Sequence, residues 1–69
     1  MAGTLEVRIG TPDAKAMRNY RYMWMVTLGG HTLGWGHTNR RDAAEQEAWD
    51  LVTSTVDPDE VEAVQVVAA

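Results

Sequence analysis

The sequence predicts a small α+β domain in which an antiparallel sheet, built around a central hairpin, carries one helix on one face. Three observations predict this fold. Residues 20–38 form two strand-like runs joined by Gly29-Gly30, a pair that suits the two positive φ angles of a short hairpin turn. Residues 4–9 alternate polar and apolar side chains, as a half-buried strand does. Residues 40–56 instead repeat apolar side chains at three- and four-residue spacing, which indicates a helix.

The first expected strand runs from Thr4 to Ile9, with its three large aliphatic side chains on the side that faces the core. The next ten residues contain Thr-Pro-Asp and no sustained apolar period. We therefore expect a connection over residues 10–19, with a short helical turn around Ala14 to Arg18.

The hairpin is expected to take its register from the Gly29-Gly30 turn. Trp24 then faces Trp35, His37 faces Tyr22, and both tryptophans are buried. The face assigned to the core carries six apolar or aromatic side chains, namely Tyr22, Trp24, Val26, Leu28, Leu33 and Trp35. On the opposite face, Met23 and Met25 lie over Gly36 and Gly34, which we interpret as glycines that make room for the methionines.

The helix is expected from Arg40 to about Val56, with Asn39 as its N-cap and Asp42 completing the capping arrangement. The stripe expected to face the sheet consists of Ala44, Ala48, Leu51, Val52 and Thr55. Trp49 lies roughly 120° from the centre of that stripe, so its indole is poorly placed for the core.

The last segment allows two interpretations. Residues 57–60 read Asp-Pro-Asp-Glu, which could begin a second helix. The following residues are rich in valine, and β-branched side chains favour a strand. We predict a final strand over about Glu62 to Val67, so that the element order is β-β-β-α-β.

Composition predicts one domain over residues 1–69. A chain this short buries only about 60% of the surface that its unfolded form exposes, so self-association is an expected source of extra stability. It has no cysteine, and it contains neither a membrane-length apolar run nor a signal-peptide pattern, so we expect a cytoplasmic protein. Its net charge of −4 is uneven, because residues 1–41 hold six basic and two acidic side chains and residues 42–69 hold eight acidic and no basic ones.

The sequence offers no catalytic set, and we expect no enzyme activity, metal or cofactor. His31 and His37 are roughly 20 Å apart along the expected strand and cannot share a metal ion. Ser54, the one serine, has no histidine near it in the sequence. Residues 34–36 lack the spacing of a phosphate-binding loop. The carboxylates of residues 57–62 fit a solvated acidic turn.

Four arginines, Arg18, Arg21, Arg40 and Arg41, are expected at the open end of the hairpin. Two interpretations stay open for them. They could pair within the chain, as Arg41 could with Glu45 one helical turn on. They could also contact an anionic partner, either nucleic acid or an acidic protein surface.

The runs Tyr-Arg-Tyr-Met-Trp (20–24), Gly-His-Thr (36–38) and Asp-Ala-Ala (42–44) resemble small strand-strand-strand-helix domains in which G-x-T precedes an alanine-rich helix. Integrase arm-type DNA-binding domains and YegP-like bacterial proteins share that outline. The overall style of the chain, including the Asp-Pro-Asp-Glu-Val ending, also resembles short accessory proteins encoded by actinobacteriophages. The resemblance implies a bacteriophage or phage-like origin and a non-enzymatic role, often interference with a host protein.

Our leading hypothesis is a small protein-interaction module that binds a host or phage protein and self-associates as a homo-oligomer. Met23, Met25 and Trp49 are its expected contact residues, since exposed methionine and tryptophan are enriched at interfaces. In a competing interpretation, residues 10–19 fold over the methionines. The alternative function is a nucleic-acid or nucleotide binder that uses the four arginines.

Overall fold

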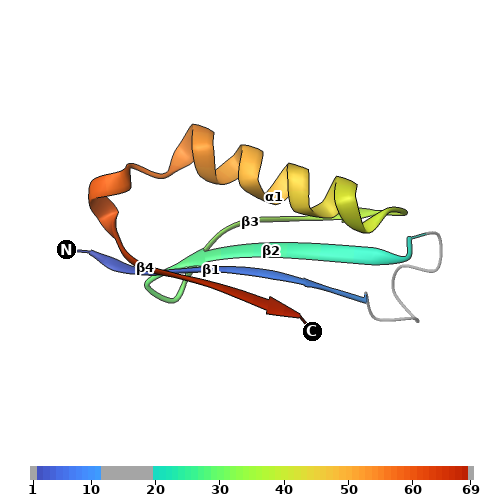
Figure 1. The fold of residues 1–69 in the computed structure, drawn as a ribbon, viewed down its shortest axis with the longest axis horizontal. Helices are drawn as coiled ribbons and strands as arrows, with labels where there is room; N and C mark the ends of the chain where they lie inside the picture. Colours follow the sequence, from blue (N-terminus) through green and yellow to red (C-terminus); the bar gives the residue numbers. More distant parts are fainter. Residues whose placement is uncertain (1, 12–19, 69) are drawn as a thin grey trace.

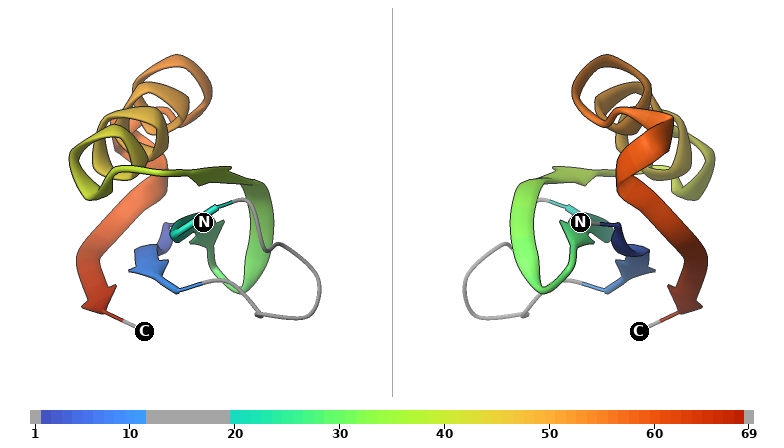
Figure 2. Two further views of the ribbon diagram at one scale, coloured as in Figure 1. Left: turned by 90° about the vertical axis from the view of Figure 1, so that its right-hand side faces the viewer. Right: turned by 90° about the vertical axis from the view of Figure 1, so that its left-hand side faces the viewer.

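A computed structural model describes residues 2–11 and 20–68. It contains, in chain order, β1 (Gly3–Gly10), β2 (Tyr22–Leu28), β3 (His31–Thr38), α1 (Arg41–Thr55), the short 3₁₀ turn η1 (Pro58–Glu60) and β4 (Val61–Ala68). Figures 1 and 2 show α1 lying along one face of the sheet. The predicted α+β class, the single helix on one face and the order β-β-β-α-β are confirmed. The helical turn expected over residues 14–18 lies outside the described residues.

The sheet has the strand order β3-β2-β1-β4. β1 and β2 are antiparallel, as are β2 and β3, but β4 runs parallel to β1. The prediction of a purely antiparallel sheet is therefore wrong. The reason is that α1 returns the chain to the end of the sheet where β3 begins, so β4 must run in the direction of β3 and β1 (Figure 1).

The last segment is mainly a strand, as predicted, and β4 is one residue longer at each end than expected. The helical start signal in Asp-Pro-Asp-Glu produces only η1. The Asp57 carboxylate caps this turn by accepting a hydrogen bond from the backbone N–H of Asp59 at 3.1 Å. The valine-rich residues beyond the turn then extend along β1.

The core lies between α1 and the sheet. Its buried apolar side chains are Leu5, Val7, Ile9, Trp24, Val26, Ala44 and Ala48, and Tyr22, Leu28, Leu33, Leu51 and Val52 are among the side chains packed around them. The two buried alanines allow the helix to approach the strands closely. This set matches the predicted core with one exception, because Trp35 is outside it.

The helix begins one residue later than predicted, and its N-cap is Arg40, which makes no side-chain capping hydrogen bond. The predicted Asn39–Asp42 capping arrangement is therefore wrong. The Thr38 hydroxyl donates a hydrogen bond to the carbonyl oxygen of Arg40 at 2.7 Å and holds the chain in place before the first turn. The Asp42 carboxylate instead accepts two hydrogen bonds from the Arg40 guanidinium.

The hairpin turn has its expected form, with positive φ at both glycines of Gly29-Gly30. The first two cross-strand pairs beyond the turn are also as predicted. The register then shifts by one residue, because Val26 opposes Gly34 and leaves Leu33 as the extra residue of a β-bulge. Such a shift moves every following side chain of β3 to the other face of the sheet.

Candidate protein-interaction surfaces

The bulge separates the two tryptophans of the hairpin. Trp24 opposes Gly36, and Trp35 opposes Met25. Trp24 is 7% exposed in the core, whereas Trp35 is 64% exposed. The predicted Trp24–Trp35 pair and the predicted burial of Trp35 are therefore both wrong.

The two glycines of β3 make room on the helix side of the sheet. A Cβ atom at Gly36 would lie 2.6 Å from Nε1 of Trp24, and one at Gly34 would lie 2.5 Å from Cδ2 of Leu51. The glycines thus accommodate the indole and the leucine, and the interpretation that they make room for methionines is wrong. The N–H of Trp24 is buried and has no hydrogen-bond partner among the described residues.

On the other side of the sheet, β2 and β3 present Met23, Met25, Trp35 and His37, which we call the open face. The prediction that both methionines point away from the helix is confirmed, but their cross-strand neighbours are His37 and Trp35, respectively, and not glycines. Both methionines are half-buried. The open face is therefore an apolar and aromatic surface with one large, exposed indole. The competing interpretation, in which residues 10–19 fold over the methionines, falls mainly on residues 12–19, which lie outside the described residues.

Aromatic contacts hold the rings of the open face in place. The Trp35 and His37 rings meet edge to face, with centroids 5.4 Å apart and an angle of 82° between planes. Tyr20 packs on His37 at a centroid distance of 5.8 Å. His37 was predicted to pack against Tyr22; the bulge moves it to the opposite face, where it contacts Tyr20 instead.

A charged pair borders the open face on β1. Arg8 opposes Met25 in the sheet, and its guanidinium lies 3.4 Å from the carboxylate of Glu6. This arrangement of an apolar centre beside a polar margin is typical of protein interfaces.

A second apolar surface is a groove between α1 and β4, with a volume of about 420 Å³. Its lining is almost entirely apolar and consists of Leu5, Trp49, Val52, Thr53, Val56, Pro58, Val61 and Val64. Trp49 is 38% exposed there, in keeping with the outward position that the helical periodicity predicts. The predicted contact residues thus divide between two surfaces, because Trp49 lies on the helix side and Met23 and Met25 lie on the open face.

Two of the four arginines of the proposed basic group pair with acids of α1. Arg40 donates to both carboxylate oxygens of Asp42, at 3.1 and 2.9 Å. Arg41 pairs with Glu45 at 3.5 Å, so the interpretation of this pair as intramolecular is confirmed. Arg21 is exposed, and Arg18 lies outside the described residues.

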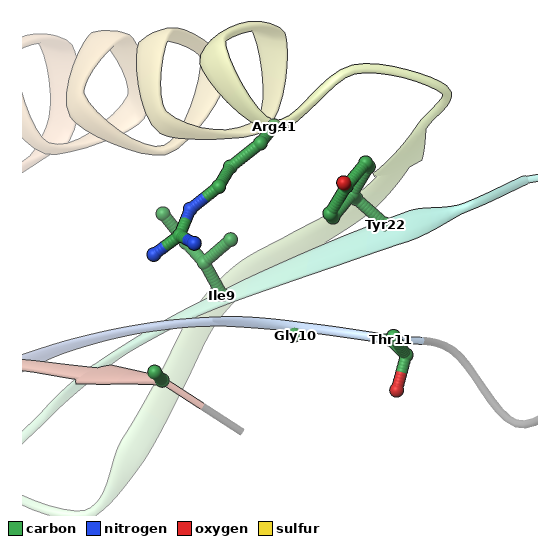
Figure 3. A pocket seen from close by; sticks show the side chains of 6 residues that line it. Ile9, Gly10, Thr11, Tyr22 and Arg41 are labelled. Carbon is green, nitrogen blue, oxygen red and sulfur yellow. The ribbon is translucent and has the colours of Figure 1, made fainter.

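A small cavity of about 180 Å³ opens beside the first turn of α1. Its lining residues are Ile9, Gly10, Thr11, Tyr22, Arg41 and Ala68. Figure 3 shows the Arg41 side chain extending from the helix toward Ile9. The lining offers one guanidinium and two hydroxyls but no carboxylate or imidazole that could act as a general base. Among residues 2–11 and 20–68, no group of three or more His, Asp or Glu side chains could hold a metal ion.

Sequence reasoning missed Trp35 as an exposed residue. The signal that could have found it is the run Gly34-Trp35-Gly36. Two glycines that flank an indole in a strand leave space on one face for large side chains, and that face is then the one turned to the helix.

Comparisons of the chain with protein-family models, with curated proteins and with solved structures find no match. Within the part of the chain that the structure describes, no helix is long and apolar enough to cross a membrane. Any assignment of function therefore depends on the open face and the groove.

Proposed function

We propose that this chain is a small non-enzymatic protein-interaction module whose open face binds a partner protein. The observation that carries the proposal is the 64% exposure of Trp35 on the apolar and aromatic open face of the sheet. Tryptophan dominates binding energy at many interfaces, and flexible methionines adapt to irregular partners. The edge-to-face contact with His37 orders the indole before binding, which lowers the entropic cost of association.

Charge favours a protein over a nucleic acid as the partner. The chain carries a net charge of −4, and nucleic-acid affinity arises mainly from cations that neutralise phosphates. Arg8, which borders the open face, and Arg41, at the start of α1, already lie beside Glu6 and Glu45, respectively. Exposed rings could stack on unpaired bases, but such sites also need a positively charged groove.

The resemblance to accessory proteins of actinobacteriophages leads us to propose a phage-like origin. On this proposal, the partner is a host or phage protein in the cytoplasm of the host cell. Binding would cover the open face and thereby interfere with, or recruit, the partner.

The test is affinity capture of the tagged protein from its native host, with quantitative mass spectrometry of the proteins that co-purify. Trp35→Ala and Met25→Glu should each remove the same partner, and Trp35→Ala should weaken its binding by about 2 kcal/mol or more. Trp49→Ala is the matched control, because it removes an exposed indole from the other side of the sheet.

Two results would contradict the proposal. One is a partner that all three variants capture as well as the original chain does. The other is tight binding to generic single-stranded RNA or DNA that weakens steeply with added salt and requires Trp35, since this would identify the open face as a nucleic-acid surface.

A further inference from the structure

β4 is an edge strand with an exposed apolar side. It is hydrogen-bonded to β1 along one edge, and no strand of the described chain pairs with its other edge. Val64 and Val66 are 57% and 63% exposed, although they alternate onto the same face as the core residues of β1. α1 packs over β1, β2 and β3 and leaves these two valines uncovered.

The two edges of the sheet differ in a way that points to β4 as a pairing site. Natural proteins protect edge strands with bulges, prolines or charged side chains. The edge strand β3 has the bulge at Leu33. In β4, the irregular pairing and the charged side chain of Glu62 are confined to the first two residues, and Ala63–Ala68 contains no charged side chain and no proline.

We infer that β4 pairs with β4 of a second copy of this chain, antiparallel and about a two-fold axis at Gln65. The surface is distinct from the open face, so this inference does not depend on the proposed function. In this register Val64 opposes the partner's Val66, and Ala63 opposes the partner's Val67. The result is one continuous eight-stranded sheet with both helices on the same side.

This pairing covers the apolar surface that each copy leaves exposed. The four valines at positions 64 and 66 of the two chains lie together on the helix side of the joined sheet. The groove that contains Trp49 includes Val64 in its lining in each copy. The two grooves therefore meet across the axis and form a shared core between the two helices.

Charge favours a second copy as the occupant, because acids lie at the start of β4 and an arginine lies near its end. The acids Asp59, Glu60 and Glu62 lie at its start, whereas Arg41, which also pairs with Glu45 of its own helix, lines a cavity with Ala68 at its end. An antiparallel pair places the acidic end of one copy beside Arg41 of the other. A parallel pair would instead bring the two acidic ends together, which is unfavourable.

Cysteine cross-linking tests the register directly, because the chain has no cysteine of its own. Directly opposed residues of antiparallel strands have Cα atoms about 4.5–5.5 Å apart, within the range that a disulfide bridges. Gln65→Cys should therefore form a disulfide-linked dimer rapidly under mild oxidation. Ala63→Cys is the matched control. In the proposed register the two cysteines at position 63 lie four residues apart along the paired strands, a separation of about 13 Å.

Sedimentation equilibrium tests the interface itself. The original chain should dimerise reversibly, and Val66→Lys should weaken the dimer at least about 30-fold by placing a charge in the shared core. Thr32→Lys, an equally exposed change on the other edge strand, should leave the dimer unchanged. Circular dichroism should show that both variants stay folded.

A chain that remains monomeric at about 1 mM would overturn the inference, because its free energy of dimerisation would then be weaker than about −4.1 kcal/mol. Cross-linking of Ala63→Cys as fast as that of Gln65→Cys would overturn it too. So would a folded Val66→Lys variant that dimerises like the original chain. None of these results would bear on partner capture by Trp35, so the two proposals fail separately.

Discussion

Gly36→Ala tests the shifted register of the hairpin through a single added methyl group. The new Cβ atom would lie 2.6, 2.8 and 3.0 Å from Nε1, Cε2 and Cζ2 of Trp24, respectively. These atoms belong to a rigid ring that is buried in the core, so the ring or the strand must move. Overpacking of this kind costs about 1–3 kcal/mol. Alanine also restricts the unfolded backbone more than glycine does, which stabilises the folded chain by about 0.4–1 kcal/mol. We therefore expect Gly36→Ala to lower the free energy of unfolding by about 1–2 kcal/mol.

Gly34→Ala is the matched control in the same strand. Its added Cβ atom would lie 2.5 Å from Cδ2 of Leu51, which is the end of a flexible and only half-buried side chain. The leucine can rotate away, so we expect the free energy of unfolding of this variant to lie within about 0.5 kcal/mol of that of the original chain.

Urea unfolding followed by circular dichroism measures both free energies. Trp24→Phe completes the test, because a smaller ring removes the atoms that the new methyl group meets. The cost of Gly36→Ala should fall by at least about 1 kcal/mol in the Trp24→Phe background. Equal stabilities for Gly36→Ala and Gly34→Ala, or no change in that background, would refute the reasoning. In the register without a bulge, Gly36 lies on the open face and the added methyl group meets no indole.

Three further perturbations test the packing and the helix ends. Trp24→Ala should lower the free energy of unfolding by about 3–5 kcal/mol, whereas Trp35→Ala should change it by less than about 1 kcal/mol in the same urea titration. An unfolded Trp35→Ala variant would place that indole in the core after all. Arg40→Ala combined with Arg41→Ala should keep the fold and change the stability by less than about 1 kcal/mol, because the loss of two exposed ion pairs is offset by removing two cations from the positive end of the helix dipole. Loss of the far-ultraviolet circular dichroism signal in that double variant would show that the arginines are structural. Asp57→Ala removes the hydrogen-bond acceptor that caps η1 and should lower the free energy of unfolding by about 0.5–2 kcal/mol, measured by thermal unfolding. An unchanged stability would mean that this cap is dispensable.

Residues on β2 could be predicted from the sequence more accurately than residues on β3. The Gly29-Gly30 turn sets the first pairs, and simple alternation then places Trp24 in the core and Met25 on the open face. The extra residue lies in β3, at Leu33, so only positions beyond it change sides. Whether a bulge forms depends on how Trp24 packs against the strand opposite, which is a tertiary contact that loop length does not encode.

The place of β4 in the sheet was likewise outside the reach of local patterns. Valine content predicted a final strand, which forms, whereas the Asp-Pro-Asp-Glu signal, which could begin a second helix, produces only the turn η1. Which edge that strand joins depends on the path of α1 across the sheet. The free edge, with Val64 and Val66 exposed, follows from that path and not from the residues of β4 alone.

The positions of the candidate contact residues were also predicted only in part by local patterns. Helical periodicity was enough to place Trp49 outside the core, because a single helix has one buried side. It could not show that Trp49 borders a groove, since that groove exists only where the end of α1 and the start of β4 come together.

The central claim is that a one-residue bulge turns Trp35 out of the core and into the open face. Nuclear Overhauser contacts between the backbone protons of the two hairpin strands measure this register directly in solution. The account predicts cross-strand contacts between Met25 and Trp35 and between Trp24 and Gly36. Cross-strand contacts between Trp24 and Trp35 would contradict it, because they would place both tryptophans on the same face of the sheet.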